Sequence, residues 1–372
     1  MASKIDPYFA IIFPSLTGGG VQRALLLLTE GLLQRQYRVD LVVGYAKGPF
    51  LSHVPAGARL VDLKAQHLRG ALPNLYRYLK DSSPSALLSA QTHANILALL
   101  ARKVSGKNVR LVISEHNNMT AVMRDPGAGR ERLLPLFARL FYPWADEVVA
   151  VSSGAADSLT GMTGLPRSSI HVIYNPLIPS DLESRMQAVC THPWLVSGGK
   201  PGILAAGRLA RQKDYPCLLR ALAILRQQMD VRLLVLGEGS ERLKLENLVN
   251  ELGLQGNVDM PGYVENIYSY MARVSTFVLS SAWEGFPSVL VEAMACGVPV
   301  VATDCPSGPS EILEGGRYGH LVPVGDPFAL AEALRNALAT PGLVEAARLR
   351  ANQFTIERAV REYLPLLTGN RS

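Results

Sequence analysis

The sequence contains no apolar run of the ~20 residues that a membrane-spanning helix requires, which argues against an integral membrane protein. The apolar stretch near the amino terminus is too short for a secretory signal and leads directly into a predicted strand. Cysteine is scarce, and its spacing shows no pairs typical of a metal site, so we expect reduced thiols in the cytoplasm. The four cysteines are Cys190, Cys217, Cys296 and Cys305.

The composition is that of a globular protein, with 48% hydrophobic and 18% charged residues, and 372 residues suffice for two domains. The charge is unevenly distributed. Residues 1–150 carry 18 Lys and Arg against 10 Asp and Glu, a balance of +8, so the remainder carries −2 to reach the net charge of +6. We expect the basic part to face an anionic membrane rather than nucleic acid, because no nucleic-acid-binding module is recognisable.

Apolar strands alternate with helical patterns along nearly the whole chain, which predicts an α/β protein with parallel sheets. A proline-rich stretch interrupts this alternation. We therefore predict a first domain over residues 1–175, a linker with an insertion over 176–200 and a second domain over 201–355. The predicted strands are 8–13, 39–43, 86–89, 109–114, 147–151 and 171–173 in the first domain, and 203–206, 232–236, 258–260, 276–279 and 300–303 in the second.

The most informative motif is EGFPSVLVE, in which Glu284 and Glu292 lie eight positions apart. Glu284 is expected in a loop after a buried strand, and Glu292 in a short helix that begins near Pro287 or Ser288 and ends at Gly297. Ligands of open α/β sheets bind at the carboxyl ends of strands, and two acceptor carboxylates there suit a ribose or a hexose. Alternatively, the acidic residues only complement the helix dipole.

A cationic motif, GRLARQKD, follows the predicted strand 203–206. Arg208 and Lys213 lie in its loop, and Asp214 is placed to cap the next helix. Two cations at a strand end and a helix N-terminus predict an anion site, most plausibly for phosphate, although exposed cations are also common on protein surfaces.

The combination of Arg208, Lys213, Glu284 and Glu292 resembles the donor half of retaining glycosyltransferases of family 4, which have the GT-B fold. The resemblance covers nearly the whole chain and is strongest over residues 202–324. It implies that the Arg and Lys hold the donor diphosphate, that Glu292 holds the ribose and that Glu284 touches the transferred sugar. It also implies two Rossmann-like, doubly wound domains that face a cleft, with a final helix over 356–372 that returns to the first domain.

Two motifs of the first domain gain a role from this resemblance. TGGGVQR places Gly18, Gly19 and Gly20 before a helix, where the family's glycine loop closes on the donor phosphate and acceptor. The motif is not the nicotinamide-binding GxGxxG, since the next acidic residue is Asp40 inside a strand, and a simple tight turn is the alternative. SEHNN places His116 at a strand end, where related enzymes have a His that contacts the transferred sugar, although a lone His is often only structural.

Further loops of the second domain match family loops that hold the nucleotide, mainly through the backbone. They contain Gly237 in LGEGS, Tyr263 and Val264 in PGYVEN, and Gly285, Phe286, Pro287 and Ser288 between the two glutamates. The motif PSGPSEIL, residues 306–313, matches a loop beside the donor sugar, although Ser310 and Glu311 could simply cap a helix.

The resemblance implies a UDP-sugar donor, retention at the anomeric carbon and no covalent nucleophile. No Asp-x-Asp, the metal-binding pattern of the other large glycosyltransferase class, occurs in the sequence. We therefore expect Arg208 and Lys213 to stabilise the leaving diphosphate in place of a divalent metal, without any cofactor. SEHNN and GPSEIL resemble bacterial enzymes that use UDP-N-acetylhexosamines, so we expect an N-acetylhexosamine donor, a lipid-linked saccharide acceptor and a cytoplasmic protein at the inner membrane face.

Other function classes compete with a transferase. A nucleotide-sugar epimerase of the same fold needs no acceptor and would leave the basic first domain unexplained. A phosphorylase would require a lysine for pyridoxal phosphate or a site for inorganic phosphate, and neither is identifiable. A periplasmic solute-binding protein would require an export signal.

Two basic amphipathic segments are candidates for docking on an anionic membrane. Residues 67–80 interleave Arg69, Arg77 and Lys80 with leucines and tyrosines, and residues 130–144 combine three arginines with leucine, phenylalanine and tryptophan. We favour the first segment because its apolar residues are mostly aromatic, whereas those of the second could fill a core stripe.

Overall fold

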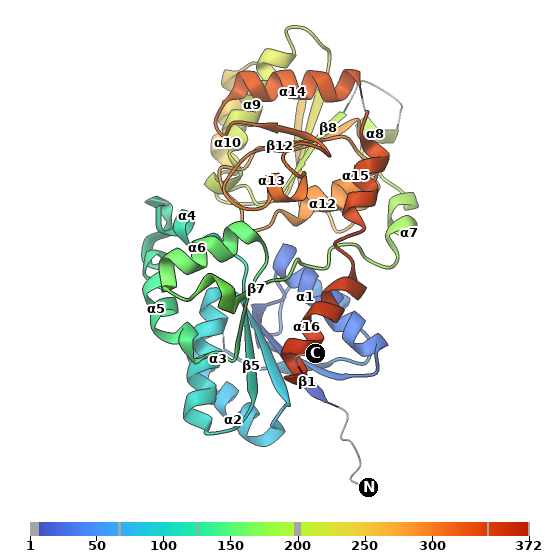
Figure 1. The fold of residues 1–372 in the computed structure, drawn as a ribbon. Helices are drawn as coiled ribbons and strands as arrows, with labels where there is room; N and C mark the ends of the chain where they lie inside the picture. Colours follow the sequence, from blue (N-terminus) through green and yellow to red (C-terminus); the bar gives the residue numbers. More distant parts are fainter. Residues whose placement is uncertain (1–6, 66–67, 125, 197–201, 341, 371–372) are drawn as a thin grey trace. The chain divides into compact units, whose positions relative to one another are not determined.

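A computed structural model describes residues 7–65, 68–124, 126–196, 202–340 and 342–370. The chain forms two compact units (Figure 1): unit 1 comprises Met1–Leu177 and Phe354–Ser372, and unit 2 comprises Ile178–Gln353. Each unit contains a wholly parallel sheet with helical connections, which confirms the predicted pair of Rossmann-like domains. The stretch expected to be a linker groups with unit 2 from Ile178 onward and includes two short helices, α7 and α8.

Unit 1 has a seven-stranded sheet in the order β3-β2-β1-β4-β5-β6-β7. Its strands are β1 (Tyr8–Ser15), β2 (Arg38–Tyr45), β3 (Arg59–Asp62), β4 (Ala86–Ala90), β5 (Arg110–Glu115), β6 (Glu147–Ala150) and β7 (Ile170–Val172). Its α-helices are α1 (Gly20–Gln34), α2 (Leu72–Ser82), α3 (Thr92–Ser105), α4 (Met119–Arg124), α5 (Leu134–Phe141), α6 (Ser153–Thr163) and α16 (Ile356–Thr368). Short 3-10 helices are η1 (Pro49–His53), η2 (Leu68–Ala71), η3 (Pro126–Leu133), η4 (Tyr142–Trp144) and η5 (Arg167–Ser169).

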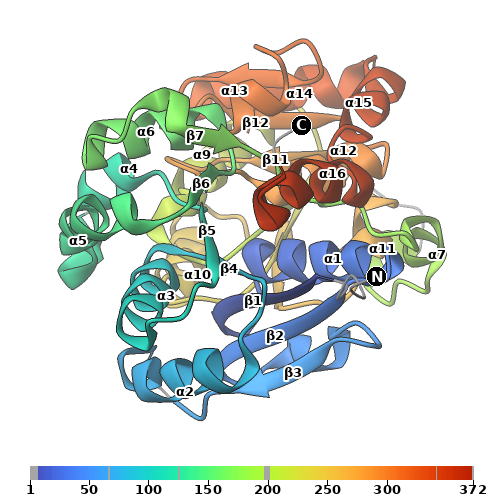
Figure 2. The same ribbon diagram turned by 60° about the horizontal axis from the view of Figure 1, so that its bottom comes forward.

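Alternate residues of β1 supply the cores on the two faces of this sheet, because successive side chains of a strand point to opposite faces. Phe9, Ile11 and Phe13 pack with α1 and α16, whereas Ala10 and Ile12 pack with α2, α3 and α6. Figure 2 shows α1 and α16 on one side of the sheet and α2 and α3 on the other. The strands are buried on both faces, which explains their nearly continuous apolar sequences.

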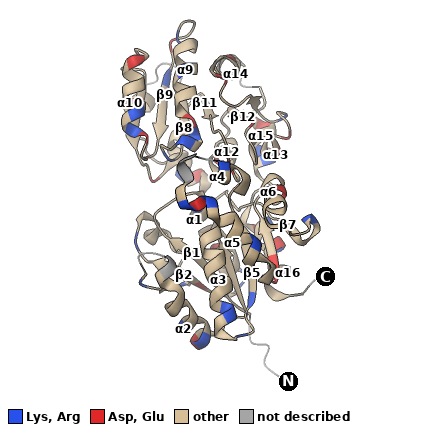
Figure 3. Ribbon diagram, turned by 90° about the vertical axis from the view of Figure 1, so that its left-hand side faces the viewer, with Lys and Arg blue, Asp and Glu red and all other residues tan. Residues whose placement is uncertain are grey.

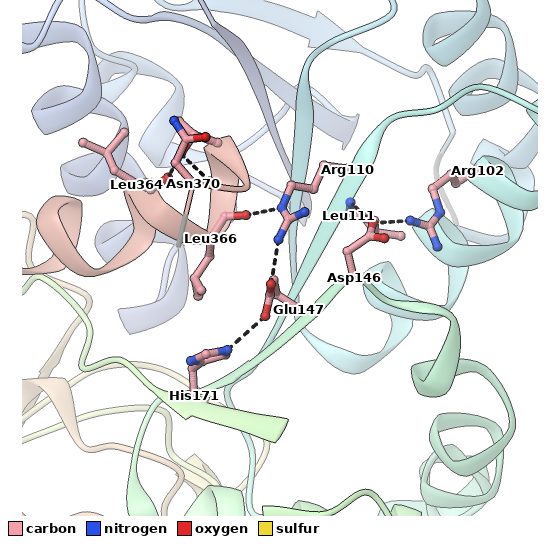
Figure 4. Close-up of polar contacts among 10 residues, drawn as sticks. Arg102, Arg110, Leu111, Asp146, Glu147, His171, Leu364, Leu366 and Asn370 are labelled. Atoms are coloured by element: carbon pink, nitrogen blue, oxygen red, sulfur yellow. Dashed lines mark hydrogen bonds and ion pairs between the residues drawn. The ribbon is translucent and has the colours of Figure 1, made fainter. Parts of the chain in front are cut away.

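The last helix, α16, is fixed to unit 1 by close packing and by a polar network. A Cβ atom on Gly31 of α1 would lie 2.3 Å from Ile356 Cγ2, so only glycine allows this approach of the two helices. Arg110 of β5 donates one hydrogen bond to the carbonyl of Leu366 and another, of 2.6 Å, to Glu147 (Figure 4). His171 of β7 lies 2.9 Å from the other carboxylate oxygen of Glu147, so three strands and α16 meet at one buried carboxylate.

Unit 2 has a six-stranded sheet in the order β10-β9-β8-β11-β12-β13. Its strands are β8 (Gly202–Ala206), β9 (Arg232–Leu236), β10 (Val258–Gly262), β11 (Thr276–Leu279), β12 (Val300–Thr303) and β13 (His320–Val322). Its helices are α7 (Leu182–Gln187), α8 (Pro193–Val196), η6 (Arg211–Lys213), α9 (Tyr215–Leu225), α10 (Arg242–Glu251), α11 (Ile267–Met271), α12 (Ser288–Ala295), α13 (Pro309–Ile312), α14 (Pro327–Ala339) and α15 (Val344–Ala351).

Two strands were missed by the sequence analysis, and one helix was misread. The edge strands β3 and β13 are only four and three residues long and carry polar ends, so they lack a clear apolar run. The apolar residues of α2 do not form an outward membrane face, because Leu75, Tyr78 and Leu79 are buried in the core of unit 1. Among the described residues, no helix is both long and apolar enough to cross a membrane.

Candidate active site

An ion pair between Lys213 and Glu284 lies at the centre of the candidate site in unit 2. Lys213 ends η6, in the loop after β8, and Glu284 lies in the loop after the neighbouring strand β11. The Lys213 ammonium is 2.6 Å from Glu284 Oε1, and the two side chains are only 15% and 7% exposed. The two motifs singled out in the sequence therefore meet at the carboxyl ends of adjacent parallel strands, where open α/β sheets bind ligands.

Glu284 is held by two further donors. Ser281 Oγ donates to Oε1 at 2.6 Å, and Gln212 Nε2 donates to Oε2 at 3.2 Å. A buried carboxylate costs several kcal/mol in desolvation unless it is paired and hydrogen-bonded, and here both conditions are met. Nearby hydroxyl and thiol groups stay protonated: burial raises the pKa of Tyr215 and of Cys305, and the charge of Glu284 raises both further.

Backbone contacts keep the two loops together. Ala282 N–H donates to Gln212 O at 2.8 Å, and Ser280 Oγ donates to Lys213 O at 2.7 Å. The neighbouring strand ends also approach closely, because a Cβ atom on Gly237 would lie 2.1 Å from the carbonyl oxygen of Gly207. Gly237 has a φ of +134°, which other residues rarely adopt, so glycine is required there for both reasons.

The other two predicted residues of this site differ in exposure. Arg208, in the loop after β8, is exposed, and within the described residues its guanidinium has no hydrogen-bonding or ionic partner. Glu292 lies in α12 and is only 4% exposed, and its Oε1 accepts a 3.3 Å hydrogen bond from Tyr268 OH. Asp214 occupies the N-cap position of α9, as predicted, with a left-handed backbone, but its side chain makes no capping hydrogen bond.

The helix that carries Glu292 begins at Ser288, as predicted, and the chain turns at Gly297 with a φ of +75°. The predicted nucleotide-loop residues Gly285, Phe286 and Pro287 are buried, whereas Tyr263 is 49% exposed. Glu284 N–H donates to the carbonyl of Pro306 at 3.2 Å, so the loop after β12 lies against the loop after β11. The motif at 306–313 is thus part of the same strand-end surface, and its helix α13 begins at Pro309.

Several site residues were not identified from the sequence. Gln212 and Ser281 contact Glu284, and Tyr268 contacts Glu292, although each of these residues lies in or near a motif that was recognised. Gln212 could have been found because it directly precedes Lys213 in the sequence. Tyr268 follows the PGYVEN motif closely, but nothing in the sequence indicates its contact with Glu292, because only the fold brings α11 beside α12.

In unit 1, His116 follows β5 at the carboxyl edge of the sheet and is only 6% exposed. Its Nε2 lies 3.1 Å from Ser114 Oγ, which in turn lies 3.2 Å from Tyr363 OH of α16. Its Nδ1 is buried and has no hydrogen-bonding partner in the described part of the chain. Burial lowers the pKa of His116 to about 3, so the ring is neutral at ordinary pH.

Glu115, the residue before His116, fixes the backbone of this loop. Its carboxylate accepts hydrogen bonds from the N–H groups of His116 and Asn117 at 3.0 and 3.1 Å. It also accepts from Thr92 Oγ1 at 2.9 Å and from Tyr142 OH at 2.7 Å. Burial raises the pKa of Glu115, whereas these four donors stabilise its charged form. The sequence analysis did not assign this role to Glu115.

The predicted glycine loop occupies the turn between β1 and α1. Gly18 and Gly19 have φ values of +105° and +132°, and Gly20 is the first residue of α1. The loop thus presents an exposed backbone at a helix N-terminus. Asp40 is not available to bind the ribose of a nicotinamide cofactor, because it is buried and hydrogen-bonded to Arg59 and Tyr78. No group of three or more His, Cys, Asp or Glu among the described residues is arranged to hold a metal ion.

Comparison with known proteins identifies two matching family models. The model described as "Glycosyl transferases group 1" matches residues 193–354, and the model described as "Glycosyltransferase Family 4" matches residues 18–180. The first model therefore covers the Lys213 and Glu284 site, and the second covers the glycine loop and His116.

Two similar proteins of Campylobacter jejuni are transferases by name. "N-acetylgalactosamine-N,N'-diacetylbacillosaminyl-diphospho-undecaprenol 4-alpha-N-acetylgalactosaminyltransferase" is 32% identical over 279 residues, which cover 74% of each chain. "GalNAc-alpha-(1->4)-GalNAc-alpha-(1->3)-diNAcBac-PP-undecaprenol alpha-1,4-N-acetyl-D-galactosaminyltransferase" is 26% identical and covers 96% of this chain and 97% of its own. Among solved structures, Anabaena HepE in complex with UDP-glucose superimposes with a TM-score of 0.78 at 21% identity, over 97% of this chain and 99% of that one.

Proposed function

Because the chain belongs to the group 1 glycosyltransferases with a family 4 amino-terminal domain and the GT-B fold, we propose that it transfers a sugar from a UDP-sugar to a lipid-linked saccharide. The observation that carries this proposal is the meeting of Lys213 and Glu284 at the strand ends of unit 2, with Arg208 exposed in the same loop. Fixed positive charge there suits a diphosphate, and a carboxylate beside it suits the hydroxyl groups of a sugar.

In this proposal, Lys213 binds first the carboxylate of Glu284 and then also the donor diphosphate. Without donor, it neutralises Glu284 and keeps the two loops together. With donor, its remaining N–H groups and Arg208 bind the diphosphate and stabilise the charge that develops as the sugar–phosphate bond breaks. Glu284 orients the transferred sugar, Glu292 binds the ribose, and no divalent metal is required. We also extend to His116 of unit 1, whose ring is neutral, the contact with the transferred sugar that the family resemblance implies.

The relatives support a finer proposal for the substrates. Both Campylobacter transferases are named for N-acetylgalactosamine transfer to undecaprenol-linked acceptors, and the Anabaena structure contains UDP-glucose. We extend to this chain a UDP-N-acetylhexosamine donor, transfer with retention, an undecaprenol-type acceptor and work at the anionic cytoplasmic face of a membrane. No observation favours an epimerase, which would leave the match to acceptor-using transferases unexplained.

Calorimetry and thermal stabilisation with a panel of nucleotide sugars test the donor proposal. A ligand at 100 times its dissociation constant should add about 2.7 kcal/mol to stability. Lys213→Ala should lower UDP affinity about tenfold or more, because a charge-assisted hydrogen bond is lost. Arg220→Ala removes an exposed cation of α9 that lies outside the motif in the sequence, and it is the matched control. Unchanged UDP affinity in both Lys213→Ala and Glu292→Ala would exclude the assigned site.

A transfer assay tests the chemistry. With a lipid-linked saccharide acceptor, activity should survive excess EDTA, and the anomeric proton of the product should keep the donor configuration by NMR. Loss of activity on chelation with recovery on adding magnesium or manganese would contradict the role given to Lys213 and Arg208. Transfer from UDP-glucose in preference to UDP-N-acetylhexosamines would contradict the donor assignment alone.

A further inference from the structure

Large apolar side chains lie on the surface of unit 1 along α5 and its flanking 3-10 helices. They recur at the spacing of one helical face, which in a soluble helix normally points into the core. Here they are exposed to solvent, and we call them the α5 surface: Leu133 (50% exposed), Leu136 (65%), Phe137 (43%), Leu140 (60%) and Trp144 (37%).

The opposite face of α5 explains this orientation. Pro135 and Ala138 are buried, and Tyr142 follows them into the core with no exposed area. α5 therefore contacts its own unit through Pro135, Ala138 and the partly buried Phe141, and presents Leu136, Phe137 and Leu140 to solvent. A contiguous exposed apolar face of this kind marks an interaction site.

Cations surround the α5 surface. Arg130 and Arg139 are exposed, and the Lys103 ammonium lies 5.8 Å from the ring centre of Trp144. Residues 123–144 contain four arginines against two acidic residues, a balance of +2. Figure 3 views unit 1 from the side of α3 and α5, with all Lys and Arg positions of the ribbon in blue. An apolar face with a cationic border suits the interface of an anionic bilayer.

The segment favoured from the sequence lacks one half of this combination. In α2, Arg77 and Lys80 are exposed, but Leu75, Tyr78 and Leu79 are buried in the core. Its most buried apolar side chains thus face the core, and the aromatic ring beside Lys80, that of Tyr76, is only partly exposed. The comparison of α2 with α5 reverses the expectation, since α5 has both the apolar face and the charges.

We propose that the α5 surface docks unit 1 on an anionic lipid bilayer. Leu136, Phe137 and Leu140 insert at the level of the headgroups, while Arg130 and Arg139 bind lipid phosphates. Each cation near an anionic surface contributes a factor of about five in affinity, so binding is reversible and sensitive to salt. This inference rests on the proposed function, because a lipid-linked acceptor requires an enzyme that reaches the membrane surface.

Vesicle binding by the full-length protein tests the assignment. We expect co-sedimentation with phosphatidylglycerol vesicles that weakens with salt and is much weaker with phosphatidylcholine vesicles. Leu136→Gln/Leu140→Gln should reduce binding at least tenfold, and Arg130→Glu/Arg139→Glu should reduce it by a similar factor. Matched controls are Leu243→Gln, at a 74% exposed leucine of unit 2, and Arg77→Glu/Lys80→Glu in α2, which should bind like wild type.

Trp144 provides a second readout. Its emission should shift to the blue on binding to vesicles, and this shift should be absent in Trp144→Phe. Equal loss of binding in the α2 and α5 variants, or binding that no α5 variant changes, would overturn the assignment. A self-associating protein whose α5 variants become monomeric by light scattering, without vesicle binding, would instead show a second copy of the chain on this surface.

The two proposals can fail separately. UDP binding belongs to unit 2 and is measured without lipid, so a vesicle-binding protein that ignores UDP would refute the proposed function and leave the α5 surface intact. Conversely, a protein that transfers sugar to a short-chain, water-soluble acceptor but never binds vesicles would refute the docking surface alone. Circular dichroism and unchanged UDP affinity verify that each α5 variant is folded.

Discussion

The two strand-end sites of this protein are built from different electrostatic components. In unit 2, Lys213 and Glu284 are opposite charges in contact, with Ser281 and Gln212 completing the carboxylate's hydrogen bonds. In unit 1, His116 is neutral, and one of its buried nitrogen atoms has no partner among the described residues. The first strand end therefore holds a buried ion pair, whereas the second holds a buried, neutral imidazole ring.

This difference predicts different consequences of mutation. Removing one charge from unit 2 leaves the other buried without its partner, which should affect both folding and binding. Removing His116 deletes a group that is only partly satisfied within the protein, so folding should suffer little while turnover suffers more. The variants therefore separate residues that stabilise the fold from residues that are proposed to contact a substrate.

The largest expected effect is that of Lys213→Ala on stability. Glu284 would remain buried with its charge unpaired, so the free energy of unfolding of unit 2 should fall by about 3–5 kcal/mol in urea titrations. The double variant Lys213→Ala/Glu284→Gln should recover much of this loss, since no uncompensated charge remains.

Lys244→Ala is the matched control for this experiment. Lys244 forms an ion pair with Glu241 but is 73% exposed, so its loss should cost less than 1 kcal/mol. If Lys213→Ala and Lys244→Ala were equally mild, the Lys213–Glu284 pair would not be the structural centre of the site, and the contrast between the two units would disappear.

Next in size is the effect of His116→Ala on turnover. If His116 contacts the transferred sugar, its loss should lower kcat about 10- to 100-fold and leave the Kd for UDP unchanged, because UDP is proposed to bind to unit 2. A purely structural His116 would give the reverse pattern, namely a lower melting temperature with near-normal specific activity. Measuring both quantities on one preparation distinguishes the two.

How far the sequence predicted these sites depends on whether the contacts are local. The loop of Lys213, the loop of Glu284 and the start of α12 at Ser288 were predicted, because strand ends, proline and helix-start signals are written in short segments. Tyr268 and Tyr363 were not, because each reaches the site through packing of a distant helix. The preference for residues 67–80 over residues 130–144 as the outward apolar segment was wrong, because both helices have amphipathic sequences and only tertiary packing selects which face is covered.

A third prediction uses pH to probe the neutrality of His116. Burial lowers its pKa to about 3, below the ordinary value of about 6.5, so the unfolded chain binds a proton that the folded site does not. The stability contributed by this difference is complete above about pH 6.5 and is lost progressively as the pH falls toward 3. Relative to His116→Gln, the wild type should lose about 2 kcal/mol between about pH 7 and pH 5.

Urea unfolding at several pH values measures this difference directly. A His116→Gln variant with the same pH dependence as the wild type would show that the pKa of His116 is the same in the folded and unfolded chain, so burial would not lower it. In activity assays, an ordinary pKa of His116 would appear as a fall in kcat below about pH 6.5 that is absent in the variant.

The smallest expected effect concerns Tyr363, which connects α16 to His116 through Ser114. Tyr363 OH lies 3.2 Å from Ser114 Oγ, and Ser114 Oγ lies 3.1 Å from His116 Nε2. Tyr363→Phe should leave Ser114 free to rotate, so His116 loses part of its orientation. We expect a loss of about 1 kcal/mol in stability and a several-fold decrease in kcat, with the Kd for UDP unchanged.

Further variants decide whether Tyr363 and Ser114 orient the His116 ring or only pack against their neighbours. Ser114→Ala should resemble Tyr363→Phe in kcat, and the two together should cost little more than either one, because both act through the same ring. Tyr215→Phe is the stability control, since it removes a buried hydroxyl that has no partner in the described chain and should not lower stability. If the kcat losses of Ser114→Ala and Tyr363→Phe were additive, or if both persisted in a His116→Ala background, the hydroxyls would not act through His116. The neutral site would then consist of His116 alone, without support from the last helix.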